Sequence, residues 1–188
     1  SSDNSFSFKI NNRFKISELF LNSKIILDNL FFRNKKKGKY FFPKIIDEIL
    51  FKNHNIKLNF KDNIFSISGS GDVLLQKKID KIEYSIDNRD RSYEIKTSLK
   101  LNSNPFLINF LNYKKDDESK AVLQTEFSVN KNKNIKIKNI NIKENNNQFL
   151  IDNIFLDKDF KIIKINKISL DYIDKDNKEN SIKIIRNK

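Results

Sequence analysis

The sequence predicts an all-β fold with two short helices, in which an antiparallel, twisted sheet is built from repeated strands. An apolar pattern of eight residues, h-x-h-x-x-h-x-h, occurs five times, and most other segments alternate apolar and polar residues. The last three copies begin at residues 135, 149 and 163, a fixed interval of 14. The apolar positions of these five octets are Phe14, Ile16, Leu19, Leu21; Ile25, Leu27, Leu30, Phe32; Ile135, Ile137, Ile140, Ile142; Phe149, Ile151, Ile154, Leu156; and Ile163, Ile165, Ile168, Leu170.

The spacing within an octet identifies the element that it forms. On a helix, the four apolar positions would lie at about 0°, 200°, 140° and 340° around the axis, which gives no apolar stripe. On a strand, the extra residue between the two apolar pairs reverses the face unless a β-bulge restores it. A hairpin turn at Lys138-Asn139 or Asp152-Asn153 is the alternative, but it leaves strands of three residues. The octets are therefore interpreted as bulged strands with one apolar face.

Two octets share almost the same residues, because Leu27-Asp28-Asn29-Leu30-Phe31 returns as Ile151-Asp152-Asn153-Ile154-Phe155. Such self-similarity indicates an internal repeat. Between the early and late octets, plain alternation predicts ordinary strands, among them a hairpin of residues 82–86 and 93–101 and a strand at 123–129. Gly69-Ser70-Gly71 is expected to form a tight connection or a bulge, and Lys35-Lys36-Lys37-Gly38 a basic turn.

Two short helices complete the expected fold. Pro43 opens an amphipathic segment with an apolar face, and Asn104-Pro105 supplies an N-cap and a first helical position for a second segment. The apolar residues of these segments are Ile45, Ile46, Ile49 and Leu50 in the first, and Phe106, Leu107, Phe110 and Leu111 in the second. We expect the first helix to cap the core.

Composition sets the class of protein. The 188 residues are 38% hydrophobic, include 17 Phe, and contain no Cys, Met or Trp, so the chain can fold without disulfides or thiolate metal sites. Since no Met is present, we expect residues 1–188 to be a single segment of a longer protein. A net charge of +13 is compatible with binding to nucleic acid, but the basic residues are mixed with acidic ones and form no single basic element. Lys, Asn, Ile and Phe, which this chain overuses, all have A/T-rich codons, so a biased genome composition can produce the charge without selection for binding.

Few residues suit catalysis or metal binding. His54 is the only histidine and is expected to be solvated in a polar loop. Asp116-Asp117-Glu118 belongs to no EF-hand pattern and is interpreted as a charged loop, while Gly69-Ser70-Gly71 matches neither phosphate-binding glycine signature. We therefore expect a protein that is not an enzyme, with no cofactor and no metal.

The successive octets, the segment Gly69-Ser70-Gly71-Asp72-Val73-Leu74-Leu75 and the helix after Asn104-Pro105 together resemble the AsmA-like proteins of Gram-negative cell envelopes, including the YhdP and TamB branches. This resemblance covers most of the chain but rests on hydrophobic patterns. It implies a long β-groove that carries phospholipid across the periplasm, anchored in the inner membrane by a helix that would lie outside this segment. It brings no catalytic residues.

A sheet with one apolar face must close on itself, pack under another layer or leave a groove for an apolar ligand. The leading expectation is a lipid-transfer groove on the periplasmic side of the inner membrane, with the octet residues lining the acyl chains and phospholipid as the partner. The first alternative is a closed structural β-sandwich without ligand, and the second is a basic nucleic-acid-binding domain. No specific nucleic acid is expected on the leading interpretation.

Overall fold

The computed structural model describes residues 1–33, 42–61, 64–89, 92–102, 104–108, 113–115, 118–130, 135–156, 162–173 and 178–186. These residues form thirteen β-strands. The strands are β1 (Ser2–Ile10), β2 (Ile16–Arg33), β3 (Glu48–Lys61), β4 (Ile64–Leu74), β5 (Ile79–Arg89), β6 (Ser92–Leu101), β7 (Leu107–Ile108), β8 (Tyr113–Lys114), β9 (Ala121–Asn130), β10 (Ile135–Glu144), β11 (Asn147–Leu156), β12 (Ile162–Ile173) and β13 (Glu179–Ile185). The basic turn expected at residues 35–38 lies outside the described residues, as do Asp116 and Asp117.

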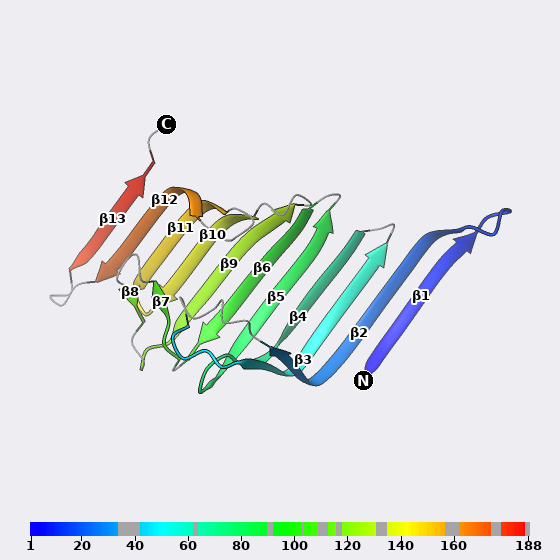
Figure 1. Cartoon of the computed structure of the whole chain (residues 1–188), viewed down its shortest axis with the longest axis horizontal. Coiled ribbons are helices and arrows are strands. Elements are labelled where there is room, and N and C mark those ends of the chain that lie inside the picture. The colour runs from blue at the N-terminus through cyan, green and yellow to red at the C-terminus, as the bar shows by residue number, and fades with distance from the viewer. Residues whose placement is uncertain are drawn as a thin grey trace.

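Eleven strands form one antiparallel sheet in the order β1-β2-β3-β4-β5-β6-β9-β10-β11-β12-β13, and β7 pairs with β8 apart from it. Figure 1 shows this meander with the two chain ends at opposite edges. The sheet is not closed, because β1 and β13 each pair with a single neighbour. The all-β, antiparallel prediction is confirmed, whereas a sandwich of two packed sheets does not hold for the described part of the chain.

Both expected helices are wrong. Residues 42–47 form a turn that is hydrogen-bonded to the segment after β4, with the Ile46 amide donating to the Leu75 carbonyl over 3.0 Å. Ile49 and Leu50 instead belong to β3, opposite Phe32 and Phe31 of β2. Leu107 starts β7, and Phe110 and Leu111 lie outside the described residues. An amphipathic run of Ile and Leu fits a half-buried strand as well as a helix, and pairing with β2 decides for the strand.

The bulged-strand interpretation of the octets is confirmed in β10. Ile135, Ile137, Ile140 and Ile142 pair with Val129, Phe127, Thr125 and Leu123, which alternate regularly along β9 and therefore share one face. The register shift falls at Lys138, between the two apolar pairs. In β10, a bulge thus returns the second apolar pair to the apolar face. The ladders of β2 and β11 also pass over one octet residue, Asp28 and Asn153, but the partner strand passes over one residue as well, so these two ladders keep their register there.

Two octets depart from the expected strand at their first residue. Phe14 lies in the turn before β2, with a φ of 56° and 91% of its surface exposed. Ile163 is skipped in the ladder between β11 and β12, so that Ile162 pairs with Leu156, and Ile163 is 65% exposed. In the octet that starts at Phe14, the apolar positions lie on the common face from Ile16 onward. In the octet that starts at Ile163, they do so from Ile165 onward.

Of the two alternatives expected for the glycine segment, the tight connection is wrong and the bulge is confirmed, because the register shift of the β3–β4 ladder lies opposite Gly71. The solvated loop expected for His54 is also wrong. Gly69 and Gly71 lie inside β4, and a Cβ atom at either residue would come within 2.5 Å of the Tyr84 ring or 2.3 Å of the His54 ring. The glycines are therefore required because two rings lie flat against the strand. His54 is in β3 and only 1% exposed, and its Nε2 lies 3.0 Å from the Asp72 carbonyl oxygen.

A second layer covers one end of the apolar face. Phe42 and Phe106 contact edge to face at 5.3 Å and pack with the buried residues of the sheet, among them Leu101 and Ile142. Figure 1 shows the β7–β8 hairpin outside the sheet, near the ends of β9–β11. Polar contacts hold this layer: the Asn104 amide donates to Asp80 Oδ2 at 2.6 Å, and the Gln76 amide donates to the Pro105 carbonyl at 2.8 Å.

Asp80 is the fully buried carboxylate of this attachment. Burial raises the pKa of the Asp80 carboxyl above its ordinary value, although hydrogen bonds from the Asn102 backbone and the Asn104 side chain and the charge of Lys115 oppose the rise. Lys115 is itself fully buried. A buried, hydrogen-bonded charge requires a fixed geometry, so the polar contacts position the covering layer.

Candidate functional site

The N-terminal part of the apolar face is not covered by any other described part of the chain. Ile16 and Phe32 are 62% and 59% exposed, although both are octet residues. Pairing extends this surface onto β1, because Phe6 is opposite Leu21 and Ile10 is opposite Ile16. Phe6 stacks on Phe8 at 6.4 Å between ring centroids, and both rings are exposed. A contiguous apolar surface of this kind on a folded protein marks a site for a partner, a ligand or a membrane.

The C-terminal part of the same face is buried. Ile142, Phe149, Ile151 and Ile154 are each no more than 4% exposed and belong to the core with Phe106 of the covering layer. Ile165, Ile168 and Leu170 of β12 pack against this core while remaining partly exposed. The structure therefore divides the expected groove-lining residues into a covered set and an uncovered one.

The total surface reflects this openness. The chain exposes 13389 Å², whereas a compact monomer of this mass exposes about 9,400 Å². The excess arises because one sheet of eleven strands carries only a partial second layer. Apolar area left in water costs about 25 cal/mol per Å², which favours a partner that covers it.

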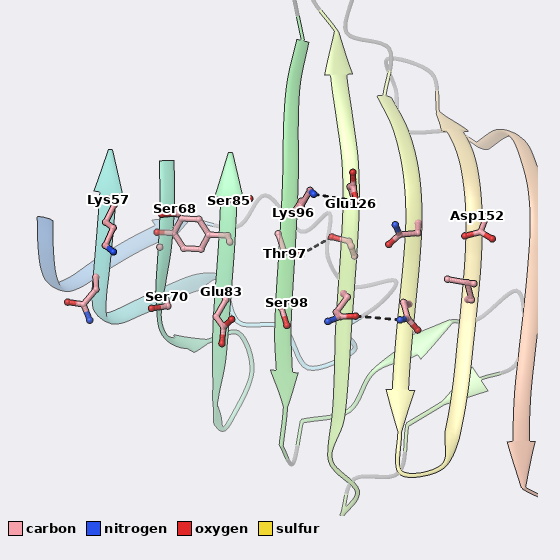
Figure 2. A pocket seen from close by; sticks show the side chains of 18 of the residues that line it. Lys57, Ser68, Ser70, Glu83, Ser85, Lys96, Thr97, Ser98, Glu126 and Asp152 are labelled. Carbon is pink, nitrogen blue, oxygen red and sulfur yellow. Dashed lines mark hydrogen bonds and ion pairs between the residues drawn. The ribbon is translucent and has the colours of Figure 1, made fainter. Parts of the chain in front are cut away.

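The opposite, polar face is hollowed at its centre. The hollow has a volume of about 1070 Å³ and spans strands β3 to β11 (Figure 2). Most of its lining side chains are hydroxyls, amides and charged groups that alternate with the apolar positions of the same strands. The lining residues are Asn55, Lys57, Ser68, Gly69, Ser70, Glu83, Tyr84, Ser85, Lys96, Thr97, Ser98, Gln124, Thr125, Glu126, Asn139, Asn141, Gln148, Leu150 and Asp152.

Ion pairs cross the strands beside this hollow. Lys138, the bulge residue of β10, contacts Glu94 at 2.5 Å and Glu126 at 3.0 Å. The hydrogen bond from the Lys138 ammonium lowers the pKa of Glu126. The pKa of Lys138 is raised, mainly by its hydrogen bond to Glu94 and secondly by its hydrogen bond to Glu126. Lys167 pairs with Asp152 at 3.3 Å in the same way. The acidic and basic groups of this face largely neutralise one another.

The chemistry of the hollow is that of a hydrated polar surface. Its lining contains two lysines and three carboxylates, so it gathers no excess positive charge for a polyanion. Neighbouring amides satisfy one another, since the Gln148 amide donates to Asn141 Oδ1 at 2.9 Å. The apolar face is therefore the better candidate for a functional surface, because it has groups that nothing in the described chain covers.

Sequence reasoning missed the polar hollow and the aromatic contacts of His54. The hollow had a signal, because Ser66, Ser68 and Ser70 alternate with apolar residues or glycine along β4. His54 contacts Phe51 of its own strand edge to face at 5.3 Å between ring centroids. Its second ring contact had no local signal, because Tyr84, which stacks on it at 5.9 Å between centroids, lies 30 residues away. Burial also raises the pKa of the Tyr84 hydroxyl.

Within the described ranges, no group of three or more His, Cys, Asp or Glu side chains could hold a metal ion. The same part of the chain has no helix with the length and apolar character needed to cross a membrane. Comparisons with protein-family models, with curated proteins and with solved structures find no match to this chain.

Proposed function

We propose that this chain is a lipid-binding segment of an envelope lipid-transfer protein, in which phospholipid acyl chains cover the apolar face of β1–β3. The supporting observation is the exposure of octet residues in β2, of which Leu30 is 49% and Phe32 is 59% exposed on an open sheet. Each methylene group that an acyl chain buries there contributes about 0.8 kcal/mol. The envelope location, on the periplasmic side of the inner membrane, rests on the resemblance to AsmA-like proteins.

A pair of adjacent phenylalanines provides a matched test. Phe32 pairs with Ile49 on the apolar face, whereas Phe31 pairs with Leu50 on the polar face, and Phe31 is 64% exposed. A photo-reactive residue is placed at either position, and the protein is irradiated with vesicles of phosphatidylethanolamine and phosphatidylglycerol. We expect phospholipid adducts in the mass spectrum from position 32 and several-fold fewer from position 31.

Salt separates this proposal from nucleic-acid binding. Acyl chains bind through apolar contact, so the adducts at position 32 should persist at 1 M salt, where the Debye length is about 3 Å. Binding to nucleic acid would instead weaken steeply with salt. Equal adducts at both positions, or salt-sensitive retention on nucleic acid without any lipid adduct, would overturn the lipid-binding proposal.

A further inference from the structure

Among the described strands, β1 pairs with β2 alone, so its other edge has no partner in this part of the chain. Ser1 and Ile26 exchange both backbone hydrogen bonds, at 3.0 and 2.8 Å, so this is a hydrogen-bonded pair of the β1–β2 ladder. Such pairs recur at every second residue of an antiparallel ladder. The odd residues of β1 therefore bond to β2, and the even residues direct their N–H and C=O groups outward. These even residues are Ser2, Asn4, Phe6, Phe8 and Ile10.

An outward row of backbone groups is a template for another strand unless the sequence protects it. Proline is absent from β1, and its charged residues are Asp3 and Lys9. Both charges lie at odd positions, on the polar face, so neither is buried by a strand that joins the edge. The apolar face beside the edge is uncovered, since Phe6 is 71% and Ile10 is 56% exposed.

Strand β1 is complementary to itself. When two copies of β1 run antiparallel over their whole length, Phe6 is opposite Phe6, Asn4 is opposite Phe8 and Ser2 is opposite Ile10. Every outward residue then meets an outward residue, as a hydrogen-bonded ladder requires. The same register places Asp3 opposite Lys9 twice, and oppositely charged cross-strand pairs stabilise a sheet.

We propose that β1 is a dimerisation edge whose partner is β1 of a second copy of this chain. The sheet would continue across a two-fold axis at Phe6, with both uncovered apolar surfaces on one side. The edge at β13 fits less well. Its full-length antiparallel register would place Glu179 opposite Ile185 and Lys183 opposite Ser181, without an ion pair.

Pairing of β13 with β1 of another copy is also less favourable. The sheet has an odd number of strands, so its first and last strands run in the same direction, as Figure 1 shows. Joining them with the apolar faces on one side would make a parallel pair, which is slightly less stable per residue. The antiparallel β1 pair is therefore the extension that the sheet favours.

Cross-linking tests the register directly, because the chain contains no cysteine. In the Phe6→Cys variant, the two cysteines would be directly opposite with Cα atoms about 5.5 Å apart, which suits a disulfide. The Phe8→Cys variant is the matched control, since its two cysteines would be displaced by about 13 Å along the strands. We expect a disulfide-linked dimer from Phe6→Cys alone under mild oxidation.

Equal cross-linking of both variants, or cross-linking of Phe8→Cys alone, would overturn the proposed register. A sedimentation experiment at high micromolar concentration tests the dimer itself, which should have twice the mass of the 22.3 kDa chain. Observation of only the monomer would overturn the dimer.

Charge reversal provides an independent test. Asp3→Lys places like charges opposite each other twice, so the dissociation constant should rise about tenfold. Adding Lys9→Asp should restore most of the affinity. Lys9 also pairs with Glu18 at 2.6 Å within the chain, but the two side chains are 70% and 61% exposed, so folding should tolerate that change.

Proline substitution distinguishes the two edges of the sheet. Phe6→Pro removes an outward N–H and should abolish the dimer without breaking the β1–β2 ladder. Lys183→Pro at the β13 edge should leave the dimer intact. Circular dichroism verifies that both variants fold. The reverse pattern, with loss of the dimer only in Lys183→Pro, would assign the interface to β13 and refute the proposal.

Discussion

The segments Leu27–Phe31 and Ile151–Phe155 differ only by Leu-for-Ile exchange at two positions, yet their surroundings are opposite. Leu30 is 49% exposed, whereas Ile154 is 4% exposed. Both segments lie in strands of one sheet, with their apolar residues on the same face. Local sequence therefore determines the strand and the face, and it does not determine whether that face is covered.

The cover comes from a distant part of the chain. Phe106, which follows β6, joins the buried core that contains Ile154, and the neighbouring residues Ile137 and Ile165 pack against the same core. The N-terminal strands have Phe6 and Phe8 of β1 beside them, and these rings are themselves exposed. One region is thus a buried core, and the other is an exposed apolar surface.

The largest difference in the free energy of unfolding is expected when a charge is introduced at the equivalent positions Ile154 and Leu30. Ile154→Asp should lower the free energy of unfolding by several kcal/mol, because the carboxylate would enter an apolar layer. Leu30→Asp should lower it by less than about 1 kcal/mol, because water already reaches that side chain. Chemical denaturation of both variants measures the difference. Similar losses would show that the two regions are equally packed.

Much of the sheet could be predicted from sequence, because the octet spacing places all four apolar residues on one face only if a bulge lies between the two apolar pairs. The covering layer could not be predicted. Its position depends on Asn104 reaching Asp80, 24 residues away, and on Phe106 packing against Ile142, and neither contact leaves a periodic signal. The helix expected after Pro43 fails for a related reason, because a short apolar run takes the structure that its partners impose.

The position of the polar hollow was equally hidden. Alternation places Ser68 and Ser70 on the face opposite Ile67, but it does not indicate which face becomes concave. Curvature depends on where bulges accumulate across neighbouring strands. Here register shifts occur in the β1–β2, β3–β4, β9–β10 and β11–β12 ladders, while β4, β5, β6 and β9 pair with one another in regular register.

A smaller effect is expected at Lys138, the bulge residue of β10. Lys138→Met should lower the free energy of unfolding by up to about 1 kcal/mol at neutral pH, because Lys138 and Glu126 are partly exposed. The pKa of Glu126 is lowered in the folded state, so this contribution is present above the unfolded pKa of about 4.3 and lost as pH falls through the folded value.

The pKa of Lys138 is raised in the folded state, so on the alkaline side the contribution is lost as pH rises through that folded value. The difference between wild type and Lys138→Met should therefore be constant between about pH 5 and 10 and shrink outside that window. Denaturation curves across pH measure it, with the exposed Lys24→Met in β2 as control. An undiminished difference at pH 3 would assign the loss to packing instead.

The smallest changes in the free energy of unfolding are expected for glycine substitutions at Asn153 and Asn29, and they should differ between the two positions. Asn153, which is passed over in the β11–β12 ladder, has a φ of 53°, while Asn29, at the equivalent position of β2, has no positive φ. Glycine adopts a positive φ without a steric penalty, so Asn153→Gly should change the free energy of unfolding by less than about 0.5 kcal/mol. Asn29→Gly should lower it by about 0.5–1 kcal/mol, because glycine weakens an extended strand. Thermal denaturation resolves this difference, and an equal loss in both variants would mean that the two asparagines share one backbone geometry.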